Sequence, residues 1–362
     1  MNHTARRDFL RLLLLGGASL GLLPACDDKK APTGAASGSP SSATTAAGGG
    51  DSDKEFQIGW SVWTGWMPFK LMQEKGFLKK RAEEHKVKIK LVEFKGYMDS
   101  VQAFAAKKLD GCAMTSMESL QPASNGVPSV AILINDRSNG GDGVLVREGT
   151  DLKGLKGKTV LLEEFSVSHY LLNRALESVG LKEKDVKIKN IPGDDAGKAF
   201  LTDKSVEAVA TWNPHLFQAV EQGKGKVVFS SKDIPDEIMD FLIMNEDALK
   251  ANPGLGPALT EAWFDAMGYF AAEATRKEAI DIMAKGAGSS VEDFEKMLKD
   301  TDLFTDKSKT ADTLEGEKLK GTMEKVKKFS FDHDLIKNEG FQIGFGHDAK
   351  SQLKFDKSYI KV

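Results

Sequence analysis

The sequence contains very little cysteine, with two residues of this type in 362. Cys26 follows an apolar N-terminal run, and Cys112 lies in a short apolar stretch without a second cysteine to pair with. A disulfide framework is therefore excluded, and the stability of the chain must come from a hydrophobic core. The apolar surroundings of Cys112 predict a buried, unreactive thiol rather than a nucleophile.

An excess of basic residues is also missing, because 50 lysines and arginines face 53 acidic residues and give a formal net charge of −3. Without a basic stripe, nucleic acid is not a predicted partner. After residue 25 no apolar run is long enough to span a bilayer. The six histidines have no metal-ligand spacing such as HxxxH, so no metal or other cofactor is predicted. They are His3, His85, His169, His215, His333 and His347.

Residues 1–26 have the features of an export signal. Paired arginines at positions 6 and 7 precede a short, uncharged, leucine-rich run that ends in LPAC. This ending resembles a bacterial lipobox, although Pro24 is unusual there, and it makes Cys26 the predicted lipidation site. We therefore expect a lipoprotein of the cell envelope that faces the periplasm and is held to a membrane by its N-terminal lipid. The paired arginines fit a twin-arginine signal and an ordinary secretory signal equally.

Residues 27–54 are composed mainly of small and polar residues and contain no large apolar side chain. Such a segment cannot bury enough surface to offset the chain entropy lost on folding. We predict a flexible tether whose random-coil reach is about 30 Å.

The stretch FQIGWSVWTGWMPFKLMQEKG, at 56–76, predicts a strand, a turn and a helix. Apolar and polar residues alternate at its start, as in a strand. A glycine then provides the turn, and Pro68 suits the first turn of a helix. Trp63, Thr64 and Trp66 would thus lie at the carboxyl end of the first strand, where open α/β sheets bind ligands. The alternative is that both tryptophans are core residues.

Strands alternate with helices over much of the remaining chain, which predicts an α/β architecture with parallel sheets covered on both faces. The predicted strands are 87–94, 111–114, 127–134, 159–163, 186–191, 206–211 and 226–229. The predicted helices between them are 97–108, 166–179, 194–202 and 214–222. From residue 247 the pattern is mostly helical, with amphipathic stretches at 259–275, 277–285 and 291–299.

Several motifs occur in an order that resembles the ABC-transporter solute-binding proteins of the nitrate/sulfonate/taurine type. They are GWSVWTGWMPF, EKGFL, DGCAMT, LKGKTV, VSHYLL and AVATWNP, followed by FSFDHDL and LKFDKSY near the C-terminus. The most similar branch is the one encoded beside urea carboxylase, which is associated with urea or guanidine transport. The likeness extends from about residue 55 to the end of the chain.

The resemblance implies a type II periplasmic-binding fold, in which two α/β lobes joined by a hinge close over one solute. Lobe one would comprise 55–140 and 238–362, including the C-terminal helices, and lobe two would comprise 141–237. The chain crossings are expected near 136–146, which is rich in glycine, and near 233–241. The implied partners are a small-molecule solute and an inner-membrane permease with its cytoplasmic ATPase. We expect a monomer.

The candidate binding site consists of the turns that follow the predicted strands, at the ligand cleft between the lobes. Thr115 and Ser166 could alternatively serve only as helix N-caps, and His169 could be an ordinary helix residue. Trp212 is the strongest candidate in lobe two, because a proline-started helix follows it. The candidates are Trp63, Thr64, Trp66, Thr115, Ser116 and Asp136 in lobe one, and Glu164, Ser166, His169, Trp212 and Asn213 in lobe two.

Two classes of solute fit these residues. Helix N-termini and hydroxyl groups favour anions such as sulfonates, taurine or nitrate. Carboxylates and three indoles, with no basic residue on the lobe-one turns other than Arg137, favour a flat, nitrogen-rich solute such as urea or guanidine. We expect this second class, and binding rather than catalysis. Two rival functions stay open, a pyrimidine-forming enzyme similar to those of thiamine biosynthesis and a module that signals to a receptor.

Overall fold

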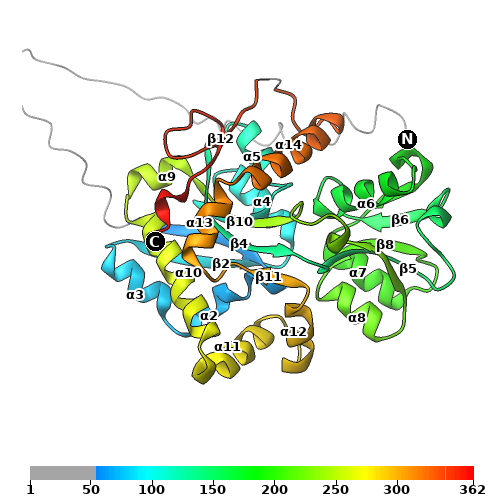
Figure 1. Ribbon diagram of the computed structural model, residues 1–362, viewed down its shortest axis with the longest axis horizontal. Coiled ribbons are helices and arrows are strands. Elements are labelled where there is room, and N and C mark those ends of the chain that lie inside the picture. Colours follow the sequence, from blue (N-terminus) through cyan, green and yellow to red (C-terminus); the bar gives the residue numbers. More distant parts are fainter. Residues whose placement is uncertain (1–53, 339) are drawn as a thin grey trace, which may run out of the picture. The chain divides into compact units, whose positions relative to one another are not determined.

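The computed structural model describes residues 54–338 and 340–362 (Figure 1). The predictions for the export signal, for Cys26 and for nearly all of the tether lie outside these residues. The described chain forms two β-sheets with helices packed on them. Among the described helices, none is long and apolar enough to cross a membrane.

The first sheet contains eight strands of the described chain, in the order β12-β13-β4-β10-β3-β1-β2 with β11 paired to β4. β1 pairs in parallel with β2 and β3, whereas β10 runs antiparallel to its neighbours β3 and β4. The prediction of purely parallel sheets is therefore wrong, because β10 brings the chain back from the second sheet without a crossover helix. The strands are β1 (Glu55–Ser61), β2 (Lys88–Phe94), β3 (Gly111–Thr115), β4 (Ser129–Ser138), β10 (Met239–Asn245), β11 (Thr301–Leu303), β12 (Ile343–Phe345) and β13 (Leu353–Phe355).

The second sheet has the order β7-β6-β8-β5-β9. Its strands are β5 (Asp142–Val146), β6 (Thr159–Leu162), β7 (Lys187–Asn190), β8 (Ala208–Trp212) and β9 (Lys226–Ser230). β5 was not predicted, because its glycine-rich surroundings indicated a chain crossing, and it runs antiparallel to β8 and β9. Only residues 139–141 separate β4 from β5. The division into lobes stays a prediction, although the strands of this sheet all come from the segment expected to form lobe two.

Each predicted helix is present, but the described chain also contains helices that were not predicted, at Phe77–Glu84, Leu120–Ser124, Glu246–Ala251, Lys307–Leu314 and Glu317–Asp332. Pro68 begins α2 (Pro68–Glu74), and α3 (Phe77–Glu84) follows directly after Gly76. The φ angle of Gly76 is 71°, a conformation that glycine adopts without steric cost, so the chain turns there. The other helices are α4 (Tyr97–Ala105), α5 (Leu120–Ser124), α6 (Val167–Ser178), α7 (Gly193–Thr202), α8 (His215–Glu221), α9 (Glu246–Ala251), α10 (Leu255–Ala271), α11 (Glu273–Gly286), α12 (Val291–Leu298), α13 (Lys307–Leu314) and α14 (Glu317–Asp332).

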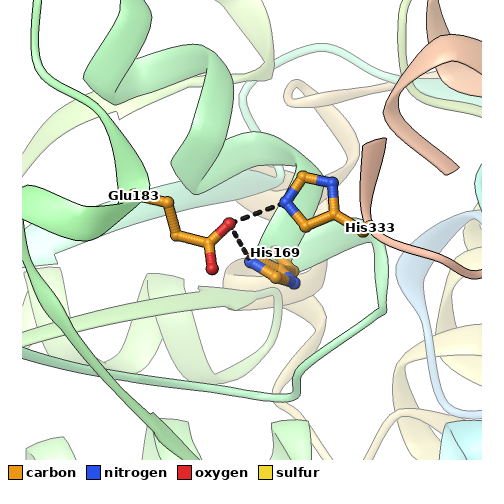
Figure 2. A group of neighbouring side chains, drawn as sticks. All are labelled: His169, Glu183 and His333. Carbon is orange, nitrogen blue, oxygen red and sulfur yellow. Dashed lines mark hydrogen bonds and ion pairs between the residues drawn. The ribbon is translucent and has the colours of Figure 1, made fainter. Parts of the chain in front are cut away.

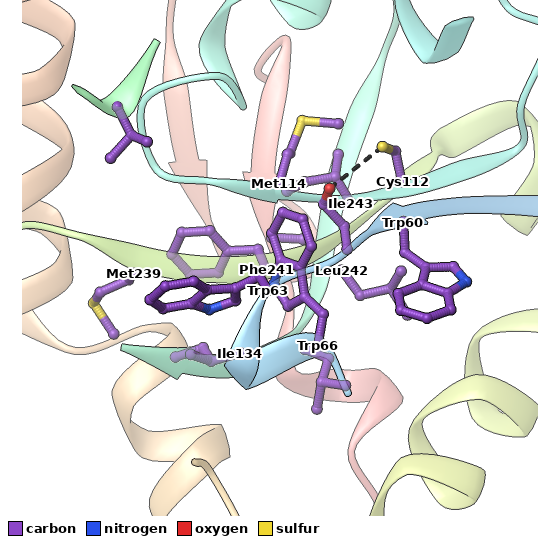
Figure 3. Packing of buried hydrophobic residues seen from close by; sticks show 14 of the residues in the cluster. Trp60, Trp63, Trp66, Cys112, Met114, Ile134, Met239, Phe241, Leu242 and Ile243 are labelled. Carbon is purple, nitrogen blue, oxygen red and sulfur yellow. Dashed lines mark hydrogen bonds between the residues drawn. The ribbon is translucent and has the colours of Figure 1, made fainter. Parts of the chain in front are cut away.

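Aromatic side chains fill the core beside β1 (Figure 3). The ring of Phe69 on α2 packs between two indoles, with centroid distances of 5.9 Å to Trp60 and 5.5 Å to Trp263. All three side chains are fully buried. Cys112 on β3 is also fully buried, and burial raises the pKa of its thiol to about 12. The prediction of a buried thiol is thereby confirmed, and the core beside β1 supports the turn that follows this strand.

Replacing Phe69 by alanine should lower the free energy of unfolding by about 3–5 kcal/mol, because the two indoles cannot close the cavity left by the ring. Equilibrium urea unfolding of the full chain measures this change. Val220→Ala is the control, since Val220 is 41% exposed and should contribute less than about 0.5 kcal/mol. Equal stability losses in the two variants would show that the Phe69 ring does not support the core.

Candidate functional site

A pocket lies among residues that come from the segments of both sheets. Its cavity volume is about 20 Å³, and the space is partly open to solvent. Several of its residues lie at strand ends, where ligands bind in α/β sheets. The lining consists of Ser61, Val62, Trp63, Trp66, Tyr97, Thr115, Asp142, Val167, Trp212, Ile238 and Asp240. The pocket is therefore the candidate binding site.

Aromatic rings form a continuous row along the pocket. Trp66, at the end of the short turn η2 (Thr64–Trp66), has its ring centroid 5.5 Å from that of Tyr97 on α4. Tyr97 in turn makes an edge contact with Trp212 at the end of β8, with a centroid distance of 6.1 Å. This contact joins the segment of the first sheet to that of the second. The indoles of Trp66, in the turn after β1 of the first sheet, and of Trp212, in the second sheet, thus line the same small space.

Carboxyl groups form the polar part of the site. Asp142 and Asp240 line the pocket, and Asp136 lies opposite Asp240 in the pairing of β4 with β10. The indole Nε1 of Trp63 donates a 2.9 Å hydrogen bond to Oδ1 of Asp136, so one wall of the pocket is attached to a carboxylate behind it. Within the described chain, Oδ1 of Asp240 has no hydrogen-bond partner. This oxygen is buried, and Asp240 lies beside the carboxyl group of Asp136.

Glu118 is a fourth buried carboxyl group, placed behind Thr115. It makes a short hydrogen bond with the Thr115 hydroxyl, and its Oε1 accepts a 2.7 Å hydrogen bond from the amide of Val167. The Thr115 amide donates to the Tyr97 hydroxyl at 3.0 Å. The amide groups at the end of β3 and at the first residue of α6 are thus already occupied by protein acceptors. They are not free to bind an anion.

Burial determines the protonation of these acids. Glu118, Asp136, Asp142 and Asp240 are each at most 4% exposed, and none of the pocket-lining residues is a lysine or arginine. Burial, helped by the neighbouring negative charges, raises the pKa of Asp142 to about 7. Burial is also the main cause that raises the pKa values of Glu118, Asp136 and Asp240. Without a solute, the site therefore retains protons near neutral pH.

Two glycines leave room for side chains of the site. A Cβ atom on Gly65 would lie 2.1 Å from the carboxyl group of Asp136, and one on Gly193 would lie 1.9 Å from the Trp212 ring. The amide of Gly193 also donates a 3.2 Å hydrogen bond to Glu163, which fixes the start of α7 beside this indole. Small residues at both positions are needed for the observed placement of the carboxylate and the ring.

Of the candidates from the sequence, Trp63, Trp66, Thr115 and Trp212 line the pocket, and Asp136 lies directly behind Trp63. The remaining candidates lie outside the lining, and most of them bond to the backbone or to other side chains. They are Thr64, Ser116, Glu164, Ser166, His169 and Asn213. Thr115 and Trp212 are the last residues of β3 and β8, whereas Trp63 and Trp66 lie in the turn that follows β1.

The residues outside the lining have identifiable structural contacts. The Ser116 hydroxyl donates to the carbonyl of Glu237 at 3.0 Å. The side chain of Ser166 is the N-cap of α6 and accepts the Ser168 amide, which was the alternative considered for this residue. Oδ1 of Asn213 accepts the Phe217 amide at 3.0 Å. These contacts direct the side chains into the fold.

The list of candidates from the sequence lacks seven of the lining residues, which are Ser61, Val62, Tyr97, Asp142, Val167, Ile238 and Asp240. Asp240 carried a usable signal, because it is an acidic residue at the start of the apolar stretch IMDFLIM, where an unpaired charge would be costly. Tyr97 carried none, since a tyrosine in the first turn of an amphipathic helix is ordinary. Its role depends on contact with Trp212, which is 115 positions away in the chain.

The model of the NMT1-like family matches residues 49–284. The chain belongs to this family. In sequence it is 27% identical over 241 residues to the "Putative aliphatic sulfonates-binding protein" of Escherichia coli (strain K12), which covers 66% of this chain and 73% of that relative.

Two crystal structures have a similar fold. The periplasmic aliphatic sulphonate binding protein SsuA of Escherichia coli has a TM-score of 0.65 and 20% identity, with coverage of 79% of this chain and 94% of that one. The alkanesulfonate-binding protein SsuA of Xanthomonas axonopodis pv. citri bound to MOPS has a TM-score of 0.66 and 17% identity, with coverage of 81% and 96%. The periplasmic-binding-protein fold expected from the sequence is confirmed. The relatives named here are binding proteins rather than enzymes, as was expected for this chain.

The pKa of Asp142 leads to a prediction for stability. Because its pKa is raised to about 7 in the folded chain and is near 4 when unfolded, the folded state binds the extra proton. This contribution is fully present below the unfolded pKa and is lost as the pH rises through about 7. The unfolding free energy should therefore fall between pH 5 and pH 8. In Asp142→Asn this fall should be smaller by about 2–3 kcal/mol than in the unchanged chain. Urea unfolding of the solute-free full chain at both pH values measures it. An unchanged pH dependence in the variant would contradict the assignment.

Proposed function

We propose that this chain is the solute-binding component of an ABC importer, and that its solute is a small, flat, nitrogen-rich molecule of the guanidine or urea kind. The family and the relatives support the first part. The second part rests on a single observation, the pocket whose walls are indoles and carboxyl groups without a basic side chain.

Guanidinium fits this chemistry in two ways. Its planar fork of N–H groups can donate paired hydrogen bonds to a carboxylate, as an arginine side chain does. Its face can stack on Trp66 or Trp212, and a cation over an indole gains about 0.5–2 kcal/mol. Oδ1 of Asp240 and Nε1 of Trp66 are buried without hydrogen-bond partners in the described chain, and urea would supply both a donor and an acceptor to them.

The alternative solute is an anion of the sulfonate kind, for which the E. coli relative is named. Such a ligand needs lysine, arginine or free amide groups close to its oxygens. The amides of Thr115 and Val167 are bonded to protein acceptors, and no lysine or arginine lines the pocket. The pocket therefore favours a cation or a neutral donor over an anion.

Closure of two lobes would explain how binding is passed to a permease. A solute shifts a conformational equilibrium only by binding one state more tightly, so it must touch both lobes. Trp66 and Tyr97 belong to the segments expected in lobe one, while Trp212 and Val167 belong to lobe two. The hydrogen bond from Val167 to Glu118 already joins these segments. With the predicted lipid anchor at Cys26, the chain would act as a monomer in the periplasm beside an inner-membrane permease and its cytoplasmic ATPase.

Calorimetric titration of the full chain with guanidinium, urea and taurine tests the proposal. Guanidinium or urea should bind and taurine should not. Trp212→Ala should weaken binding by more than about tenfold, because it removes one face of the stacking surface. Asp142→Asn should weaken the binding of guanidinium more than the binding of urea, because only guanidinium is charged.

Asp356→Asn is the matched control for Asp142→Asn. Asp356 is also a buried carboxylate, 2% exposed, but it contacts His347 and the Ser358 amide away from the pocket. This variant should bind as the unchanged chain does. Tight binding of taurine with no response to guanidinium or urea would overturn the nitrogen-rich assignment and leave the anion alternative.

A further inference from the structure

Two histidines and a glutamate from three separate parts of the chain meet outside the pocket (Figure 2). His169 lies on α6, Glu183 lies in the short 3-10 helix η4 (Glu183–Asp185), and His333 follows the last residue of α14. Oε2 of Glu183 is 2.6 Å from Nε2 of His333 and 3.3 Å from Nε2 of His169. The three ligand atoms all lie within 4.8 Å of one another. None of these residues lines the pocket.

The ring of His333 is oriented as a metal ligand requires. Its Nδ1 is 2.9 Å from the carbonyl oxygen of Phe329, so Nδ1 carries a proton and donates it. The Nε2 atom therefore faces Glu183 at 2.6 Å, a distance that requires a proton between the two atoms, and it can present its lone pair to a cation once that proton is released. A backbone carbonyl that holds the other ring nitrogen is the usual support of a metal-bound histidine.

His169 contributes a buried nitrogen next to the Glu183 carboxylate. The side chain is 2% exposed, and its Nε2 points towards Glu183, which is an ion-pair contact without hydrogen-bond geometry in the described chain (Figure 2). A buried imidazole nitrogen costs free energy unless something satisfies it. The rings of His169 and His333 meet nearly at right angles, with an interplanar angle of 78° and a centroid distance of 5.1 Å. Their edges therefore converge on the glutamate.

We propose that His169, Glu183 and His333 form a binding site for a divalent transition-metal ion such as Zn²⁺. Two imidazoles and one carboxylate are a ligand set that zinc accepts, with a fourth position left for water or another group. Asn173 is placed to supply that group, since its amide nitrogen is 3.3 Å from Oε2 of Glu183 and 3.4 Å from Nε2 of His333. Rotation of the amide would present its oxygen instead.

Metal binding would release to solvent the proton held between His333 and Glu183, and it would also shift the ring proton of His169. The amide of Phe165 donates a 3.2 Å hydrogen bond to Nδ1 of His169, which places the ring proton on Nε2. On binding, the metal replaces this proton at Nε2 and the neutral ring carries its proton on Nδ1, so the bond from Phe165 is lost. A bound ion would then connect α6 and η4 directly to α14, and this site is independent of the proposed solute.

Titration of the full chain with Co²⁺, followed by visible absorption, tests the site, and Zn²⁺ should displace the Co²⁺ signal. One equivalent should bind. Glu183→Gln and His333→Ala should each weaken binding beyond the roughly 10–100-fold loss caused by removing an outer-shell partner. Zn²⁺ should raise the melting temperature of the unchanged chain and not that of Glu183→Gln.

His347→Ala is the control. His347 also lies 2.9 Å from a carboxylate, that of Asp356, but among the described residues it belongs to no cluster that could hold a metal ion. It should bind Co²⁺ as the unchanged chain does. Circular dichroism identifies a variant that fails to fold, in which case the isosteric Glu183→Gln decides alone. Absence of a saturable Co²⁺ spectrum, or equal affinity in Glu183→Gln and the unchanged chain, would overturn the proposal and leave a metal-free ion-pair cluster.

Discussion

Four carboxyl groups buried in one region, with no basic side chain lining the pocket beside them, are the constraint on which the site depends. Two of them, Asp136 and Asp240, face one another across β4 and β10. Such a cluster is costly while it is charged and empty, and raised pKa values lessen this cost by keeping protons bound. A donor-rich solute would lower the same cost by hydrogen bonding to the carboxylates. The buried carboxyl groups that destabilise the empty site are thus also the groups that would bind a donor-rich solute.

The surrounding fold positions this cluster through a hydrogen bond and through the space that two glycines leave. The indole of Trp63 is hydrogen-bonded to Asp136, and the turn that carries it rests on the aromatic core beside β1. Gly65 and Gly193 leave the space that Asp136 and Trp212 occupy. Because these positions lie close to backbone turns, small changes there would move a wall of the pocket.

Membership of the NMT1-like family and the periplasmic-binding-protein fold agree with a binding role, but they leave the solute open. The relative named for sulfonates and the acidic pocket described here point to different charges of ligand. The difference is physical, because an anion site needs donors that are not already used. The proposed metal site adds a second feature whose residues lie outside the pocket, and it concerns the connection of α6 to α14 rather than recognition of the solute.

The sequence by itself determined the order of most strands and helices, the first strand with its tryptophan turn, the buried Cys112, and the resemblance to solute-binding proteins. These features depend on local periodicity or on short motifs, which are visible along the chain. Tertiary structure decided the direction of β5 and β10, the pairing of Asp136 with Asp240, and the contact of Tyr97 with Trp212. It also brought His169, Glu183 and His333 together. Each of these depends on residues far apart in sequence, whose proximity arises only when the chain folds, and no spacing rule encodes it.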